Sequence, residues 1–242
     1  MIRELDGKVA LVTGASSGIG RAIARKLAQS GCRLILSGRS EVRLDALAAE
    51  LGPDTVAVPH DLAIEAEVCR PLERTKEEFG QLDILMLNAG LFSNKLFANE
   101  DATASQKMID VNLSSVVRLT HAALPLLKDQ GTADILGIGS VAGVSDMRNE
   151  AVYSATKHAL NAFLRSLRRQ IASDGIRVGS ILPGTVATEL WGFTDAAEID
   201  DKVEDGEVLR AEDIANIAEF LLKQPSHVAI RELVVLPHGQ DI

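Results

Sequence analysis

The sequence contains few of the side chains that bind metals or form disulfides. It has two cysteines, Cys32 and Cys69, and five histidines in 242 residues, and neither set has the spacing of a metal site. The cysteines lie in a predicted strand entry and a predicted helix, where thiols serve mainly as packing groups. We therefore predict that the protein holds no metal.

Long hydrophobic runs are also missing, although 46% of the residues are hydrophobic. No apolar run approaches the ~20 residues that a membrane span requires, and residues 1–6 contain no apolar signal region. The formal net charge of −9 disfavours a nucleic-acid partner, which would require a basic face. These absences predict a cytoplasmic protein without a membrane or nucleic-acid partner.

Aromatic residues make up only 3% of the chain, and Tyr153 is its single tyrosine. Tyr153 lies four residues before Lys157, which in a helix places the phenol and the ammonium on one face. A phenol titrates near pH ~10, so it transfers protons poorly at neutral pH unless a cation such as Lys157 favours the phenolate. The hydroxyl of Ser140, thirteen residues upstream, could polarise a carbonyl beside it. The trio predicts a proton-transfer site; an ordinary amphipathic helix face is the alternative.

A glycine-rich segment follows the first apolar run of the chain. The run covers residues 9–13, the glycines follow as G-x-x-x-G-x-G over 14–20, and Ile19, Ile23 and Leu27 then recur at helical spacing. Glycines let a backbone approach a pyrophosphate, and the start of a helix offers unpaired N–H groups to the anion. The segment therefore predicts a phosphate-binding turn, although its spacing departs from the usual G-x-G-x-x-G.

Apolar runs of strand length alternate with helical segments along the whole chain. The runs lie at 9–13, 33–37, 55–59, 82–87, 133–139, 177–182 and 232–236. This alternation is typical of a parallel sheet with helices on both faces, and right-handed crossovers make it a doubly wound, Rossmann-type α/β fold. No linker interrupts the pattern, so we predict one domain over residues 1–242. Ligands of such sheets bind beyond the carboxyl ends of the strands, where the motifs lie.

The order and spacing of these motifs resemble the short-chain dehydrogenase/reductase family over about residues 5–239. The matching elements are residues 13–20, Asn88-Ala89-Gly90, Asn112, Ser140, Tyr153 with Lys157, and Pro183-Gly184. The resemblance implies a seven-stranded sheet of order 3-2-1-4-5-6-7. It also implies hydride transfer between a nicotinamide cofactor and a carbonyl or secondary alcohol.

The resemblance assigns catalytic roles to four residues. Ser140 would polarise the carbonyl oxygen and Tyr153 would donate the proton in the reductive direction. Lys157 would lower the pKa of the phenol and bind the ribose. The main-chain carbonyl of Asn112 would hold a water that resupplies the proton.

The resemblance also implies a cofactor site. It would consist of Gly14, Ser16, Ser17, Gly18, Ile19, Gly20, Ser37, Gly38, Arg39, Asp61, Leu62, Asn88, Ala89, Gly90, Tyr153, Lys157, Pro183, Gly184, Val186 and Thr188. In it Asp61 would accept from the adenine amino group, although a helix cap is an equal alternative for an isolated aspartate. The backbone of Val186 would meet the carboxamide, and Thr188 would lie near the phosphates.

The residues after the second strand predict which dinucleotide binds. NAD is usually held there by an acidic side chain on the ribose, but this chain has Gly38 and then Arg39. Because a guanidinium suits a phosphate, we predict NADP(H), with Ser37 and Ser40 as extra donors. A surface arginine at a turn is the alternative.

Most of the negative charge is concentrated in one segment. Residues 189–213 contain ten acidic and two basic residues, a net of −8, and match the family's variable substrate lid, here about 188–213. A solvated helix face is the alternative. Phe92, Trp191 and Phe193 are candidates for the pocket wall. An acidic lid would repel an acidic carrier protein, which predicts a small neutral or cationic carbonyl substrate.

We therefore predict an NADP-dependent carbonyl reductase or alcohol dehydrogenase acting on a small molecule. The alternatives are a non-catalytic NADP-binding sensor, a 3-oxoacyl-carrier-protein reductase and a sugar-nucleotide epimerase. The family resemblance also implies a homodimer or homotetramer that pairs through residues 103–127 and 153–173.

Overall fold

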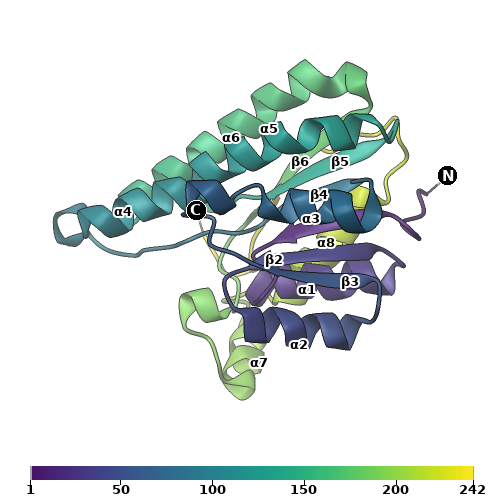
Figure 1. The fold of residues 1–242 in the computed structure, drawn as a ribbon. Coiled ribbons are helices and arrows are strands. Elements are labelled where there is room, and N and C mark those ends of the chain that lie inside the picture. The colour runs from purple at the N-terminus through teal and green to yellow at the C-terminus, as the bar shows by residue number, and fades with distance from the viewer. Residues whose placement is uncertain (1, 242) are drawn as a thin grey trace.

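The computed structural model describes residues 2–241, which form a parallel sheet between two layers of helices (Figure 1). The strands are β1 (Val9–Thr13), β2 (Arg33–Gly38), β3 (Thr55–Pro59), β4 (Ile84–Leu87), β5 (Ala133–Ile138), β6 (Ile176–Pro183) and β7 (Glu232–Val235). Their order is β3-β2-β1-β4-β5-β6-β7 and every pairing is parallel. The predicted fold class and strand order are confirmed. Residues 1 and 242, the ends of the predicted domain, lie outside the described residues.

The helices are α1 (Gly18–Gln29), α2 (Glu41–Leu51), α3 (Arg70–Phe79), α4 (Ala102–Ile109), α5 (Ser115–Lys128), α6 (Ala151–Ile171), α7 (Ala196–Glu204) and α8 (Ala211–Leu222). Helices cover both faces of the sheet, but α7 buries no residue and stands apart from it (Figure 1). Successive strand residues point to opposite faces: Ala10 and Val12 pack with α1, α2 and α8, whereas Val9 and Leu11 pack with α3, α5 and α6. Covering both faces explains why the predicted strands are continuous apolar runs rather than alternating ones.

Five of the seven strands differ from the predicted runs by one or two residues at an end, and only 9–13 and 55–59 match at both ends. The run 82–87 becomes a strand only from Ile84, and the run 133–139 ends at Ile138. Asp83 is fully buried just before β4, where its carboxylate accepts from the Lys8 ammonium at 2.7 Å and from the Val9 N–H at 2.9 Å. This side chain ties the beginning of β4 to the beginning of β1, and the carboxyl ends of the strands remain for the site.

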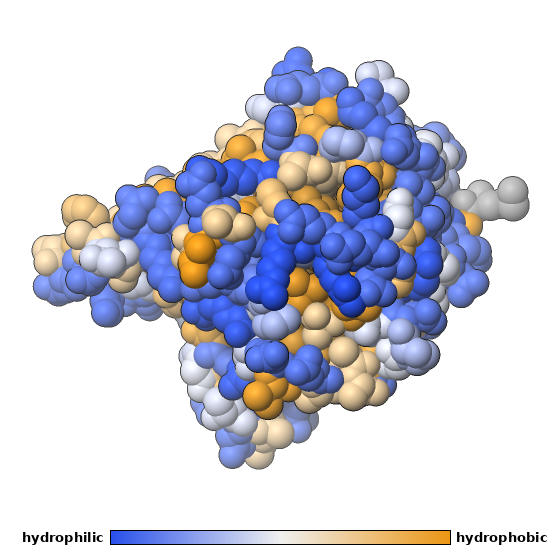
Figure 2. Space-filling model, viewed as in Figure 1, coloured by the Kyte–Doolittle hydropathy of each residue, from blue (hydrophilic) through white to orange (hydrophobic). Residues whose placement is uncertain are grey.

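Figure 2 shows hydrophilic side chains over much of one face, with smaller apolar patches between them. Within residues 2–241, no helix is both long enough and apolar enough to cross a bilayer.

Candidate active site

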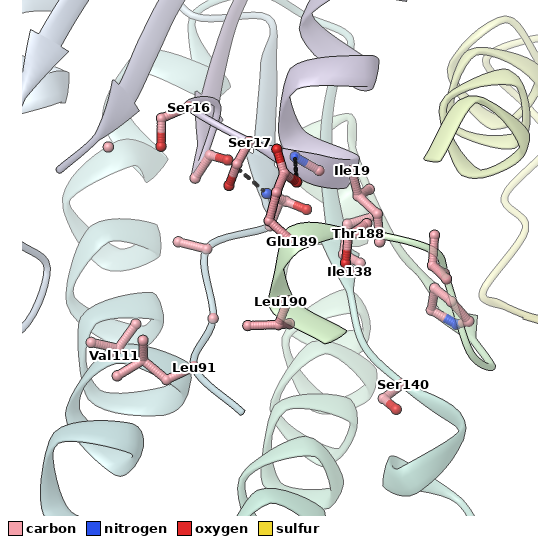
Figure 3. Close-up of a pocket in the computed structure, with 18 of the residues that line it drawn as sticks. Ser16, Ser17, Ile19, Leu91, Val111, Ile138, Ser140, Thr188, Glu189 and Leu190 are labelled. Atoms are coloured by element: carbon pink, nitrogen blue, oxygen red, sulfur yellow. Dashed lines mark hydrogen bonds between the residues drawn. The ribbon is translucent and has the colours of Figure 1, made fainter. Parts of the chain in front are cut away.

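A cavity opens at the carboxyl edge of the sheet, between the loops that follow β1, β2, β3, β4, β5 and β6 (Figure 3). Of the predicted cofactor residues, only Gly20 and Ser37 do not line it, and of the predicted catalytic residues only Asn112 does not. The parallel sheet explains this convergence, because all its strands end at one edge. Residues from six separate loops therefore form one cavity.

The loop after β1 is shaped by its glycines. Gly14 adopts a φ of +68°, and a Cβ built on it would lie 2.8 Å from the Asn88 side-chain nitrogen. A Cβ on Gly20 would lie 2.3 Å from the Gly14 carbonyl oxygen, so Gly20 packs α1 against the loop and does not face the cavity. The loop fits a dinucleotide pyrophosphate, because a bare backbone leads directly into the N-terminus of α1.

Hydrogen bonds join this loop to the loop after β4. The Thr13 hydroxyl donates to the Met86 carbonyl at 3.1 Å and accepts from the N–H groups of Asn88 at 2.9 Å and Ala89 at 3.1 Å. The Asn88 side chain donates back to the Thr13 carbonyl at 2.9 Å. Thr13 and Asn88 therefore hold the two loops at a fixed separation.

The loop after β2 lacks an acidic side chain, and Arg39 is exposed at the cavity. Arg39 forms no ion pair within residues 2–241. A Cβ on Gly38 would lie 3.2 Å from the Ser16 hydroxyl, so a larger residue at this position requires the Ser16 side chain to move by a few tenths of an ångström. The guanidinium is thus available to a ligand.

The serines beside Arg39 differ from the prediction. Ser37 is fully buried and does not line the cavity; its hydroxyl is hydrogen-bonded to His60 Nε2 at 2.6 Å. Successive strand side chains point in opposite directions, so Ser37 faces away when Gly38 faces the cavity. The Ser40 hydroxyl caps α2 by accepting from the Arg43 N–H at 3.4 Å. Neither hydroxyl is placed as the expected extra donor.

His60 lines the cavity, although no motif of the sequence predicted a role for it. It is buried, and burial lowers the pKa of its imidazole despite the nearby carboxylates of Glu67 and Asp61, which act to raise it. Its Nδ1 atom has no hydrogen-bond partner within residues 2–241. The only sequence signal was its place, directly after the predicted third strand.

Asp61 lines the cavity and closes a local turn with Ala63, but it does not cap a helix, and its contact with an adenine stays a prediction. One carboxylate oxygen accepts from the Ala63 N–H at 3.0 Å and the other from the Lys107 ammonium at 3.3 Å. Burial acts to raise the pKa of Asp61, but these donors outweigh it and hold the pKa below its usual value. Asp61 is therefore ionised and remains an acceptor at the cavity.

Ser140, Tyr153 and Lys157 meet at the inner end of the cavity. Tyr153 and Lys157 are both buried and lie one turn apart on α6, with the Lys157 ammonium 5.6 Å from the centre of the phenol ring. Ser140 follows β5, and its hydroxyl accepts from the Ala142 N–H at 3.1 Å beside the phenol. The predicted trio is thus brought together by α6 and the end of β5.

Burial dominates the electrostatics of the trio. Burial raises the pKa of Tyr153 to about 12; the Ser140 hydroxyl acts to lower it and the Glu150 carboxylate to raise it further. Burial also lowers the pKa of Lys157 to about 8. The Lys157 ammonium donates to the Ile138 carbonyl at 3.0 Å. Burial is the largest influence on the pKa of the phenol in this arrangement, and the expected lowering of that pKa by Lys157 stays a prediction.

Asn112 supports the site from behind. It lies in a π-helical turn, Asp110–Ser114, between α4 and α5. Its side chain is paired with the backbone of Leu91, accepting at 2.7 Å and donating at 2.9 Å, and it also donates to the Thr156 hydroxyl at 3.1 Å. It therefore joins the loop after β4 to α6, next to Tyr153 and Lys157. The expected water at its main-chain carbonyl stays a prediction.

The lid supplies side chains to the mouth of the cavity. Glu189, Leu190 and Trp191 line it, whereas Phe193 does not. The Trp191 ring packs on Phe92 with ring centres 4.2 Å apart, and Phe92 meets Tyr153 edge to face at 4.9 Å. Of the three predicted wall residues, only Trp191 lines the cavity, and Phe92 packs behind it. The contact of Glu189 with the glycine loop was not predicted, because no local pattern connects residues so far apart in the sequence.

Comparison with known proteins identifies the family. The family model of the short chain dehydrogenases matches residues 8–198. The protein belongs to this family. An uncharacterized oxidoreductase of Staphylococcus saprophyticus is 39% identical over 241 residues, covering 97% of this chain and 99% of the relative. A second, from Staphylococcus epidermidis, is 36% identical over 97% of this chain and 99% of its own.

Solved structures of this short-chain dehydrogenase fold superpose closely on the chain. An alcohol dehydrogenase from Thermococcus sibiricus complexed with 5-hydroxy-NADP has a TM-score of 0.89 at 32% identity, covering 98% of this chain and 99% of that one. A 3-ketoacyl-(acyl-carrier-protein) reductase from Brucella melitensis complexed with NADH has a TM-score of 0.88 at 29% identity, covering 97% and 98%. An L-sorbose reductase from Gluconobacter frateurii complexed with NADPH and L-sorbose has 0.88 at 28%, covering 99% and 98%.

No group of three or more histidine, cysteine, aspartate or glutamate side chains within residues 2–241 is arranged to hold a metal ion. The buried thiol of Cys32 is one of the packing groups of the core, and burial raises its pKa to about 12. Such a thiol is protonated at neutral pH and is a poor metal ligand.

Proposed function

We propose that this protein is an NADP(H)-dependent oxidoreductase that interconverts a carbonyl and a secondary alcohol. The observation that carries the proposal is the position of Ser140, Tyr153 and Lys157 at the inner end of a cavity that also contains the glycine loop of β1 and α1. A dinucleotide whose pyrophosphate lay on that loop would extend toward the trio. Membership of the short chain dehydrogenase family supports the same reading.

The nicotinamide dinucleotide would supply or accept the hydride, and the protein would manage the proton. Ser140 would hold the carbonyl oxygen, and Tyr153 would donate its phenolic proton to that oxygen in the reductive direction. With its pKa raised to about 12, Tyr153 is a protonated donor at neutral pH. Lys157, with a pKa of about 8, stays mostly protonated at pH 7 and would stabilise the phenolate once the proton has left.

The preference for NADP(H) is supported by Gly38 and Arg39. An acidic residue that would repel a 2′-phosphate is missing from the end of β2, and the exposed Arg39 guanidinium has no competing carboxylate partner within residues 2–241. Structural neighbours bind NADH, NADPH and an NADP analogue, so the family alone does not decide between the two cofactors.

The substrate that we propose is a small, largely apolar, neutral or cationic carbonyl compound. Around Tyr153 the cavity is formed by Leu91, Leu190 and Trp191, with Phe92 packed behind them. Glu150 is half-buried near the phenol and contributes a negative potential there. The acidic lid begins at the cavity mouth with Glu189 and adds to this potential.

Reduction of a 3-oxoacyl group on a carrier protein is the second candidate, because the Brucella melitensis neighbour is such a reductase. The comparison of kcat/KM for a 3-oxoacyl carrier protein with that for a neutral β-keto ester separates the two. We expect the neutral ester to be preferred at both low and moderate salt. A preference for the carrier substrate that salt abolishes would show that the acidic lid faces away from the docking surface.

The test of the whole proposal is a cofactor-oxidation screen over ketones, diketones, β-keto esters and 3-oxoacyl thioesters, run in parallel with Tyr153→Phe. This variant keeps the ring and loses the proton, so turnover should fall by at least ~10²-fold while the dinucleotide still binds. Equal turnover in the variant would overturn the role of Tyr153. Dinucleotide binding by an enzyme that turned over no substrate would favour the sensor.

We also propose a cytoplasmic, single-domain enzyme with its lid at about 188–213. It would assemble as a homodimer or homotetramer through α4, α5 and α6. Val117 is 39% exposed on α5, as a residue of a contact surface would be before assembly. Light scattering at micromolar concentration should give a multiple of 25.9 kDa, and a monomer mass would contradict the assembly.

A further inference from the structure

The side chain of Glu189 lies across the start of α1 (Figure 3). One carboxylate oxygen accepts from the Gly18 N–H at 3.1 Å, and the other accepts from the Arg21 guanidinium at 3.0 Å. Gly18 is the first residue of α1, and Glu189 follows β6 at the beginning of the lid. A carboxylate from a distant segment therefore occupies the phosphate-binding turn that the glycines form.

The helix start explains why an anion is held there. The first N–H groups of a helix lack partners within it and lie at the positive end of its dipole. Ser17, the residue before α1, makes no side-chain cap, and the first turn of α1 contains no acidic residue. Glu189 therefore supplies the carboxylate at this helix start.

We propose that the Glu189 carboxylate occupies the pyrophosphate subsite and competes there with the dinucleotide. This competition would lower the affinity of the protein for its dinucleotide. The proposal rests on the proposed cofactor role of the glycine loop. A pyrophosphate on this loop would accept from the same Gly18 N–H, and two anions repel each other at that distance. Dinucleotide binding therefore has to displace the Glu189 carboxylate.

Displacement of Glu189 would also move Trp191, whose ring packs on Phe92 next to Tyr153. Glu189 and Trp191 belong to one 3₁₀ turn, which the Trp191 N–H closes by donating to the Thr188 carbonyl at 3.0 Å. Trp191 packs on Phe92, which contacts Tyr153. A shift of Glu189 would therefore move the Trp191 ring, so that dinucleotide binding would rearrange the cavity wall next to Tyr153.

The first test is calorimetric titration of the wild type and Glu189→Gln with ADP-ribose and its 2′-phosphate, which both carry a pyrophosphate. The amide keeps the size of the side chain and removes its charge. We expect the variant to bind the tighter of the two ligands roughly 3–10-fold more tightly, the scale of a lost charge at an exposed helix start. Adenosine 2′-monophosphate, which lacks the pyrophosphate, should bind both proteins equally.

Glu204→Gln is the matched control. Glu204 belongs to the same acidic segment, is exposed at the end of α7, and forms no ion pair within residues 2–241. Its substitution changes the net charge of the lid by the same amount without touching α1. If Glu189→Gln binds the pyrophosphate ligands no more tightly than Glu204→Gln does, the competition is overturned.

The second test uses the fluorescence of Trp191, which is the only tryptophan of the chain. ADP-ribose or its 2′-phosphate should change the emission of the wild type, whereas adenosine 2′-monophosphate should not. Emission that stays constant at saturation would overturn the coupling to the lid. If neither pyrophosphate ligand binds the wild type, the proposed cofactor role itself fails; if they bind with the same affinity as to Glu189→Gln, only this inference fails.

Discussion

The cavity lies between two regions of the chain that are held in place differently: the loops at the ends of the strands, and the lid. The inner and cofactor ends consist of strand-end loops whose backbones are fixed by buried or half-buried hydrogen bonds from Thr13, Asn88 and Asn112. The lid, by contrast, is largely exposed. Within residues 2–241 few backbone hydrogen bonds join it to the rest of the chain; one of them is donated by the Gly239 N–H to the Gly206 carbonyl. On the proposed function, dinucleotide binding and proton transfer would depend on a rigid edge, whereas substrate choice would depend on a segment that can change without unfolding the sheet.

The largest effect should come from a methyl group at the rigid end. In Gly20→Ala the new Cβ would lie 2.3 Å from the Gly14 carbonyl oxygen and 2.4 Å from the Asn88 side-chain nitrogen, so the loop must separate from α1. We expect the free energy of unfolding to fall by about 3 kcal/mol and dinucleotide binding to be lost. Urea unfolding and calorimetry measure the two effects.

Gly192→Ala is the matched change in the lid. Gly192 has a φ of +85° but nothing lies within 4 Å of its Cβ position. The expected cost is about 1 kcal/mol from the backbone alone, with dinucleotide affinity retained. Equal losses in the two variants would show that the lid is as tightly constrained as the loop after β1.

The second effect concerns the cofactor end only. Arg39→Ala should weaken NADPH binding by roughly 1.5–3 kcal/mol, the scale of a lost charge-assisted hydrogen bond, and leave NADH almost unchanged. Adding Gly38→Asp should then favour NADH. Arg43→Ala, an exposed arginine on α2, is the control and should have little effect. A wild-type enzyme that prefers NADH at equal concentration would contradict the assignment.

A third change should affect only the substrate end. Phe92→Ala removes the ring between Trp191 and Tyr153, so kcat/KM for an apolar ketone should fall by about 10-fold, mainly through KM. The dissociation constant of the dinucleotide should stay the same. Phe97→Ala, which removes a ring that is 69% exposed, is the control. An unchanged KM in Phe92→Ala would place the substrate elsewhere.

The smallest effect should be on stability at acid pH. Burial lowers the pKa of His60 in the folded protein, so the folded state holds its imidazole neutral more strongly than the unfolded chain does. The stability that this provides is present above the unfolded pKa of ~6.5 and is lost as the pH falls below it. Between pH 7 and pH 5 the free energy of unfolding should therefore fall less in His60→Gln than in the wild type, by a difference of less than about 1 kcal/mol. Urea unfolding at both pH values measures this difference. A parallel decline in both proteins would exclude His60 as a source of acid sensitivity.

Much of the fold and of the catalytic trio could be predicted from the sequence, because both depend on short-range patterns. A buried parallel strand needs a continuous apolar run of about five residues, as in Val9–Thr13. The spacing of Tyr153 and Lys157 needs one turn of helix, and the glycines after β1 mark a turn that excludes side chains. Once the strands are parallel, their carboxyl ends share one edge, so the site follows from the topology.

The remaining features were decided by the tertiary structure, because they depend on how segments distant in the sequence pack together. Ser37 bonds to His60, which directly follows the neighbouring strand β3, and Glu189 contacts Gly18, which is far from it in the sequence. The raised pKa of Tyr153 likewise comes mainly from its burial, to which the packing of Phe92 on its ring contributes. Local periodicity determines which elements form and which residues reach the sheet edge. Where a side chain at that edge points, which group it bonds to and how far it is buried depend on the packing of the whole chain. A local sequence pattern carries no information about that packing.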